Sequence, residues 1–219
     1  MIQTVFRKEV LEQKNLRAII ASLQQFIYAD WAGRAETDHE KEIIREYFDC
    51  LEGSPPPETF ASLILAHSST SLNHYPSAVA RSFSKLMDIL GVGEYYMIAH
   101  LPHQLLAKSK MSYPPLAKAY KRLAALSPAD SRKHAFLISN ELSAEVIKSI
   151  FWIHRCDQSV PEYVFFSPKD DSFVMSLCKY GNLHFEAFTP ERADQINTLH
   201  SKAGLITIIP PETERFKNQ

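Results

Sequence analysis

Several features that common enzymes and exported proteins need are scarce or missing in this sequence. Only six of its 219 residues are glycine. Neither G-x-G-x-x-G nor G-x-x-x-x-G-K-[ST] occurs, so a nucleotide held by a glycine-rich loop is not expected. The patterns H-E-x-x-H, C-x-x-C and G-x-S-x-G are also absent. These absences argue against zinc proteases, zinc ribbons, thioredoxin-like redox proteins and ordinary α/β-hydrolases.

Cysteines and long apolar runs are equally sparse. The three cysteines, Cys50, Cys156 and Cys178, form no close pair, and an odd number at distant spacing suits a reducing compartment. No apolar stretch approaches the roughly 20 residues that span a bilayer. Charged residues already stand at positions 7–9, where a signal peptide needs an apolar stretch. We therefore expect no membrane partner, and either a cytoplasmic location or export without a cleavable signal.

The overall composition is that of a soluble globular protein. Hydrophobic residues make up 45% of the chain and charged residues 22%, which is close to the average for globular domains and excludes wholesale disorder. A chain of this length buries roughly 70% of its unfolded surface, so its core needs no disulfide staples. The net charge of −1 excludes a chain that is polycationic throughout.

That small net charge conceals two opposite blocks. Residues 36–58 contain eight acidic and two basic residues, a net charge of −6, whereas residues 108–133 contain seven basic residues and one acidic residue, a net charge of +6. Lys118, Lys121 and Arg122 stand together at helical spacing in the basic block, and we expect them to bind any partner of that block. The partner could be a phosphate, a nucleic acid, an acidic protein or the acidic helix of this same chain.

The first half of the chain has a helical pattern. Apolar residues recur every three or four positions over residues 10–31, 38–51 and 76–91, and a further helix is expected to carry Phe60, Leu63, Ile64 and His67. Pro102 and the pair Pro114-Pro115 suggest additional helix starts. We expect a helical region over residues 1–127, and the small polar stretch 127–131 is the best boundary candidate.

The second half has a mixed pattern. Short apolar or aromatic runs predict strands at 135–139, 163–166, 173–180, 183–188 and 205–209, with helices at 142–154 and 189–199. Gly181-Asn182 predicts a two-residue hairpin turn. The expected fold class is α+β: an N-terminal helical region and then a mixed sheet of about five strands with two helices, over residues 132–211. Residues 212–219 form a polar tail. The alternative is one continuous domain.

Histidines offer a possible metal site. His67, His74, His100 and His103 fall in one window, and the last two have an H-x-x-H spacing. Zinc sites usually add a carboxylate or thiolate, and none stands at a recognisable ligand offset. We expect ordinary hydrogen-bonded or solvent-facing histidines and no cofactor, with a metal site at these four residues as the alternative.

A catalytic site can still be assembled from residues scattered along the chain. His154, Cys156 and His184 are the candidates for this enzyme alternative, although Cys156 follows a predicted helix end, where the dipole does not favour a thiolate. We expect Cys178 to be packed in a strand. Asp170-Asp171 is explained by a turn, so no carboxylate is assigned a catalytic role.

The missing motifs and the segregated charges favour one function over two others. We expect a non-catalytic protein that binds another protein, as an adaptor, a regulator, a secretion-associated factor or an immunity protein. The alternatives are an enzyme using His154, Cys156 and His184, and a phosphate or nucleic-acid binder using residues 108–133. Nucleic acid is not the favoured partner.

Overall fold

The computed structural model describes residues 2–53, 55–102, 113–126, 134–212 and 216. Within these residues, eight strands form one antiparallel sheet in the order β1-β4-β3-β5-β6-β7-β2-β8. The strands are β1 (Gln3–Phe6), β2 (Ala61–His67), β3 (Glu94–Ala99), β4 (His134–Ser139), β5 (Val164–Pro168), β6 (Phe173–Leu177), β7 (Leu183–Ala187) and β8 (Leu205–Ile208).

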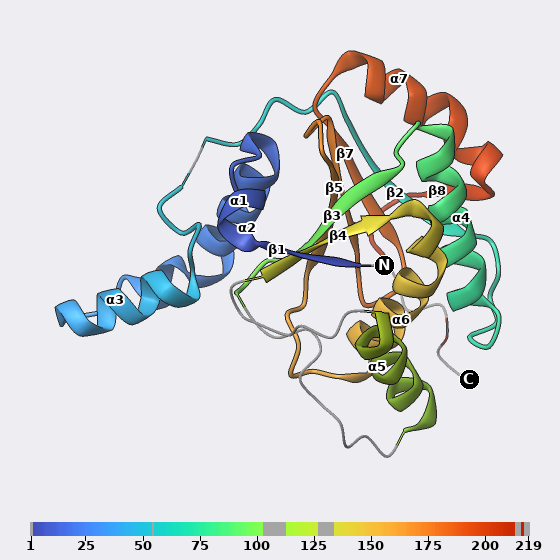
Figure 1. The fold of residues 1–219 in the computed structure, drawn as a ribbon. Coiled ribbons are helices and arrows are strands. Elements are labelled where there is room, and N and C mark those ends of the chain that lie inside the picture. Colours follow the sequence, from blue (N-terminus) through green and yellow to red (C-terminus); the bar gives the residue numbers. More distant parts are fainter. Residues whose placement is uncertain (1, 54, 103–112, 127–133, 213–215, 217–219) are drawn as a thin grey trace.

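Helices cover both faces of this sheet, which gives an α+β fold (Figure 1). They are α1 (Arg7–Val10), α2 (Lys14–Ala32), α3 (Asp38–Tyr47), α4 (Tyr75–Ile89), α5 (Pro114–Leu126), α6 (Ser143–Cys156) and α7 (Pro190–Leu199), with short 3₁₀ turns at Asn140–Leu142 and His200–Ala203. Within the described residues, every helix is too short or too polar to cross a lipid bilayer.

Strand alternation divides the core into two layers. Phe166, on β5, packs with α4 and α6 in the larger core, whereas its neighbour Phe165 packs with Leu16 and Ile20 of α2 on the opposite face. Neighbouring strand residues point to opposite faces, so these central strands are apolar on both sides. The sheet is therefore the middle layer, between α2 and the group α4, α5, α6 and α7.

The structure corrects the expectation of a helical first half. β1, β2 and β3 all precede residue 127, and the single sheet combines them with strands from the second half. Residues 61–67, expected to be helical, form β2. Their apolar spacing resembles a helical face, but a strand buried on both faces is also continuously apolar, and periodicity does not separate the two. The sheet is also larger than about five strands, and its pairings are antiparallel instead of mixed.

The hairpin between β6 and β7 is longer than expected. The Gly181 N–H donates to the Cys178 carbonyl oxygen at 2.8 Å, and the Cys178 N–H donates to the Asn182 carbonyl oxygen at 3.0 Å. Gly181 has a φ of +81°, which glycine adopts without a steric penalty. The turn therefore occupies residues 178–182 and places Cys178 directly opposite Asn182.

Candidate functional site

Helix α3 extends away from the body of the molecule as the outer part of a projecting arm (Figure 1). We define the arm as residues 26–52, which comprise the end of α2, the helix α3 and the segment after it. A complete capping box starts α3: the Thr37 side chain accepts from the Glu40 N–H, and the Glu40 carboxylate accepts from the Thr37 N–H. This cap satisfies backbone donors that would otherwise be free at the start of a solvent-exposed helix.

A buried polar network fixes the base of the arm. The Arg7 side chain is 4% exposed and donates to both carboxylate oxygens of Asp49, with Nε 2.6 Å from Oδ2. It also donates to the Ala99 carbonyl oxygen at 2.5 Å. Gln24 donates to the His100 carbonyl oxygen at 2.6 Å and accepts from the Cys50 N–H at 2.9 Å. The segment after α3 is thereby tied to α1, α2 and the end of β3.

Aromatic contacts join the two helices of the arm. Phe48 packs against Tyr28 and Trp31 of α2, with ring centroids 4.5 Å and 5.5 Å apart. The Tyr28 hydroxyl lies 3.1 Å from Nε2 of His100, at the end of β3. Burial lowers the pKa of His100 to about 4, so its ring is neutral near pH 7. A chain of aromatic contacts therefore runs from the sheet into the arm.

The outer surface of the arm is apolar and acidic at once. Phe26 is 90% exposed and Trp31 is 54% exposed, and they are accompanied by Ile27, Ile43 and Tyr47. The acidic residues of α3 are exposed as well. The two bases of α3 already pair within the arm: Arg45 with Glu52 at 3.1 Å, and Lys41 with Asp38 at 3.6 Å. A pocket lies beside this surface, lined by Ala32, Lys41, Ile44, Arg45, Phe48, Leu51 and Glu52.

The described part of the basic block lies on α5, across the sheet from the arm (Figure 1). Lys118 and Lys121 are exposed, while Arg122 forms an ion pair with Glu145 of α6 at 2.6 Å. Tyr120 donates to Asp157 at 2.6 Å and is buried. Of the possible partners, the acidic helix of the same chain is therefore not contacted by the described residues of α5.

The four histidines of the metal alternative have different surroundings. His67 ends β2 and accepts from the Ser69 N–H, His74 precedes α4 and is exposed, and His100 is buried at the base of the arm. β2 and β3 are four strands apart in the sheet, or about 19 Å at the usual strand spacing. His67 and His100 therefore do not converge, and His103 lies outside the described residues.

The three residues of the enzyme alternative are not brought together either. His154 and Cys156 stand two positions apart on α6, so their side chains leave the helix in different directions. His154 Nδ1 lies 3.1 Å from the Leu177 carbonyl oxygen, and burial lowers the pKa of this histidine to about 4. Burial raises the pKa of the Cys156 thiol, which opposes a thiolate. His184 has other neighbours.

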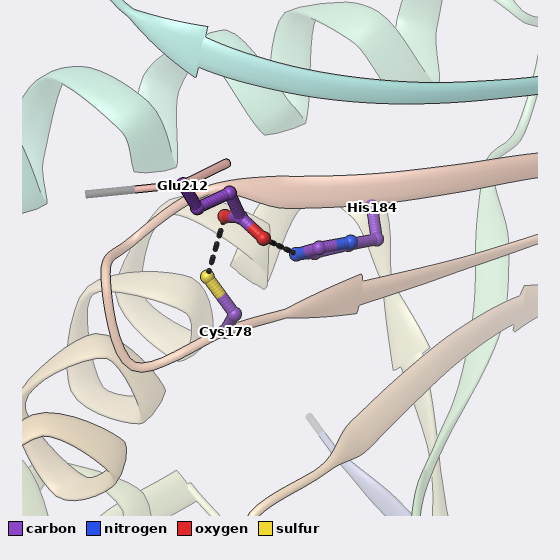
Figure 2. A group of neighbouring side chains, drawn as sticks. All are labelled: Cys178, His184 and Glu212. Atoms are coloured by element: carbon purple, nitrogen blue, oxygen red, sulfur yellow. Dashed lines mark hydrogen bonds and ion pairs between the residues drawn. The ribbon is translucent and has the colours of Figure 1, made fainter. Parts of the chain in front are cut away.

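Those neighbours are Cys178 and Glu212 (Figure 2). The Cys178 thiol donates to Glu212 Oε2 at 3.3 Å, and His184 Nε2 lies 3.1 Å from Glu212 Oε1. One potential ligand atom from each residue lies within 4.8 Å of the other two. Burial, and then the Glu212 charge, raise the pKa of the thiol to about 12, so Cys178 in this arrangement is not an activated nucleophile.

Part of this cluster could be found from the sequence. A hairpin centred on the predicted turn brings Cys178 and His184 to the same end of two paired strands, so the sequence spacing alone could have predicted that these two residues are close. The position of Glu212 could not have been predicted, because it lies in the expected polar tail and no local signal shows that the chain returns to the hairpin there. The exposure of the aromatic residues on the arm likewise depends on tertiary packing.

Comparisons of the chain with protein-family models, with curated proteins and with solved structures gave no match.

Proposed function

We propose that the protein is a non-catalytic binding protein of the adaptor, regulatory, secretion-associated or immunity kind. Its arm docks a second protein that presents basic side chains around an apolar site. The observation that carries this proposal is the 90% exposure of Phe26 and the 54% exposure of Trp31 on the arm that also carries the acidic helix α3.

Exposed aromatic side chains keep apolar surface in contact with water, and a partner that covers them removes this unfavourable contact. Burying apolar surface is worth about 25 cal/mol per Å², and tryptophan, tyrosine and phenylalanine are enriched in the cores of protein interfaces. Phe26, Trp31 and Tyr47 supply such side chains within one projecting segment. A partner covering them gains affinity from residues that contribute little to the core of this chain.

The acidic residues give the interface its selectivity. Because Lys41 and Arg45 are already paired within the arm, an incoming protein meets a surface dominated by carboxylates. Complementary charge raises the association rate and orients a partner more than it raises affinity. A basic partner is therefore favoured, and an acidic surface, such as that of a nucleic acid, is repelled.

The base of the arm favours binding without large rearrangement. Arg7 and Gln24 hold the residues after α3 through buried hydrogen bonds, and Phe48 packs between the two helices. A surface that is held before binding loses less conformational entropy when the partner docks.

Quantitative affinity capture with matched variants tests this proposal. The tagged wild-type chain is compared with the arm variant Phe26→Ser/Trp31→Ser and with the control Lys118→Glu/Lys121→Glu on α5. The expected result is a stoichiometric protein that the wild type and the α5 variant capture equally and that the arm variant captures at least tenfold less. Circular dichroism establishes that both variants fold.

Two results contradict the proposal. Equal capture by the wild type and the arm variant removes the arm from the interface. Loss of capture in the α5 variant alone would show that the partner binds the basic block and not the arm. Sedimentation of the purified chain tests whether the partner is a second copy of the same chain. Only in that case does the arm variant have a lower molecular mass in solution than the wild type.

A further inference from the structure

The β6–β7 hairpin and the C-terminal segment meet at a group of three side chains of different chemistry. Cys178 follows β6, His184 lies on β7, and Glu212 follows β8 after the chain has turned back (Figure 2). Leu183 and Phe185 point into the larger core, so His184 between them points to the other face of the sheet. We propose that Cys178, His184 and Glu212 bind one zinc ion. This proposal is independent of the function proposed for the arm.

The separations of the candidate ligand atoms fit a tetrahedral zinc ion. With usual zinc–ligand bond lengths and tetrahedral angles, a sulfur and a carboxylate oxygen lie about 3.6 Å apart, and a nitrogen and an oxygen about 3.4 Å apart. The corresponding separations are 3.3 Å from Cys178 Sγ to Glu212 Oε2 and 3.1 Å from His184 Nε2 to Glu212 Oε1, the other oxygen of the same carboxylate. One ligand atom from each residue lies within 4.8 Å of the other two. Rotation of the carboxylate and small side-chain shifts would therefore bring all three residues around one ion.

The histidine nitrogen is available for a metal. His184 Nε2 is buried, and within the described part of the chain it makes no hydrogen bond, although it lies 3.1 Å from Glu212 Oε1. A metal ion placed between the imidazole and the carboxylate would use the lone pair of this nitrogen. The nitrogen thus faces the carboxylate that would share the ion with it.

Neighbouring groups orient the other ligands. The Asn182 side-chain amide donates to Glu212 Oε2, and the Cys178 N–H donates to the Asn182 carbonyl oxygen at 3.0 Å. Asn182 is 1% exposed, so its position is fixed by packing. Hydrogen bonds of this kind to ligand carboxylates tune metal sites and contribute about 10- to 100-fold to affinity.

The ligand set selects the metal. Sulfur, imidazole nitrogen and a single carboxylate suit zinc, whereas magnesium and calcium require mainly oxygen ligands. On binding, Cys178 loses its thiol proton to solvent and His184 coordinates as neutral imidazole. The thiolate and the carboxylate then balance the two positive charges of the ion. Three protein ligands leave a fourth position for water or an external ligand.

Cobalt(II) titration of the metal-stripped full-length chain tests the proposal, because cobalt reports tetrahedral sulfur coordination by its visible and near-ultraviolet absorption. The expected result is one cobalt ion per chain, with a sulfur-to-cobalt charge-transfer band that one equivalent of zinc abolishes. Cys178→Ser removes the band, and Glu212→Gln weakens binding at least tenfold. Cys156→Ser, a matched loss of another partly buried thiol, leaves the titration unchanged.

The opposite outcomes overturn the proposal. They are a wild-type chain that gives no charge-transfer band at millimolar cobalt, a band that Cys156→Ser removes instead of Cys178→Ser, or unchanged affinity in Glu212→Gln. Glu212 lies outside the sheet, after β8, so Glu212→Gln is expected to fold. This variant therefore tests the proposal even if Cys178→Ser does not fold. Far-ultraviolet circular dichroism of each variant separates misfolding from loss of a ligand.

Discussion

Arg7 and Asp49 form a two-point ion pair that joins the first helix to the residue after Phe48, at the base of the arm. Arg7 Nε lies 2.6 Å from Asp49 Oδ2, and its Nη2 lies 3.1 Å from Oδ1. Arg7 is almost fully buried and also reaches the Ala99 carbonyl oxygen on β3. This guanidinium group therefore makes a direct connection between the arm and the sheet, alongside the hydrogen bonds of Gln24.

Removing that group is expected to loosen the arm and lower stability. Arg7→Met leaves Asp49 with only a 3.3 Å hydrogen bond from Gln24 and removes the side-chain donor of the Ala99 carbonyl. This is expected to cost about 3 kcal/mol of unfolding free energy in urea titrations. Hydrogen exchange is expected to accelerate in α3 more than in α4. Arg45→Met breaks an exposed pair with Glu52 and should change stability by less than about 1 kcal/mol. Equal effects of the two substitutions would contradict the anchoring role of Arg7.

His100 makes stability depend on pH in a defined direction. Its pKa is about 4 in the folded chain, mainly because of burial, against 6.5 for the free side chain. The unfolded chain therefore binds the proton more strongly, so stability is full above about pH 6.5 and falls as the pH decreases towards 4. The loss is on the order of 3 kcal/mol for a shift of this size.

Urea titrations at several pH values measure this effect. His100→Gln is expected to reduce the dependence between pH 6.5 and 4 by about half, because His154, whose pKa burial also lowers to about 4, still contributes. His74→Gln, which replaces an exposed histidine, should keep the wild-type slope. A His100→Gln chain that loses as much stability on acidification as the wild type would rule out this histidine as the source.

Asp171 is expected to stabilise the folded chain by capping the start of α2 from a turn that is distant in the sequence. Its carboxylate oxygens accept from the N–H groups of Asn15 at 2.6 Å and Leu16 at 3.1 Å, in the first turn of α2. Its φ of +53° is tolerated by aspartate and asparagine better than by alanine. Asp171→Ala should therefore cost about 2 kcal/mol and Asp171→Asn about half as much in thermal or urea unfolding. The reverse order would contradict this account.

The residues show why part of the fold was predictable and part was not. β5 was predicted because residues 163–166 are aromatic or β-branched, and β7 was predicted because residues 183–188 follow the turn signal Gly181-Asn182. β2 was predicted as a helix because Leu63, Ile64 and His67 fit helical spacing, and only pairing with β7 and β8 on either side decides its conformation. β1 and β3 depend on the same long-range pairing, which local propensity does not encode.

The same limit applies to the candidate sites. The acidic character of residues 36–58 was visible in the sequence, but the apolar spacing of α2 and α3 suggested inward-facing residues. Their exposure follows from α3 projecting beyond the sheet, so that Ile43 and Tyr47 have less of the core to pack against. Tertiary placement therefore turns an ordinary amphipathic helix into a candidate interface.

Photo-crosslinking from the arm in living cells tests the central claim most directly. p-Benzoylphenylalanine replaces Phe26 on the arm or, as a control, Tyr113 beside α5, which is 44% exposed. One dominant crosslinked protein with a basic surface is expected from position 26, and no such product from position 113. Absence of a specific product at position 26, or the same product from both positions, would contradict a binding role for the arm.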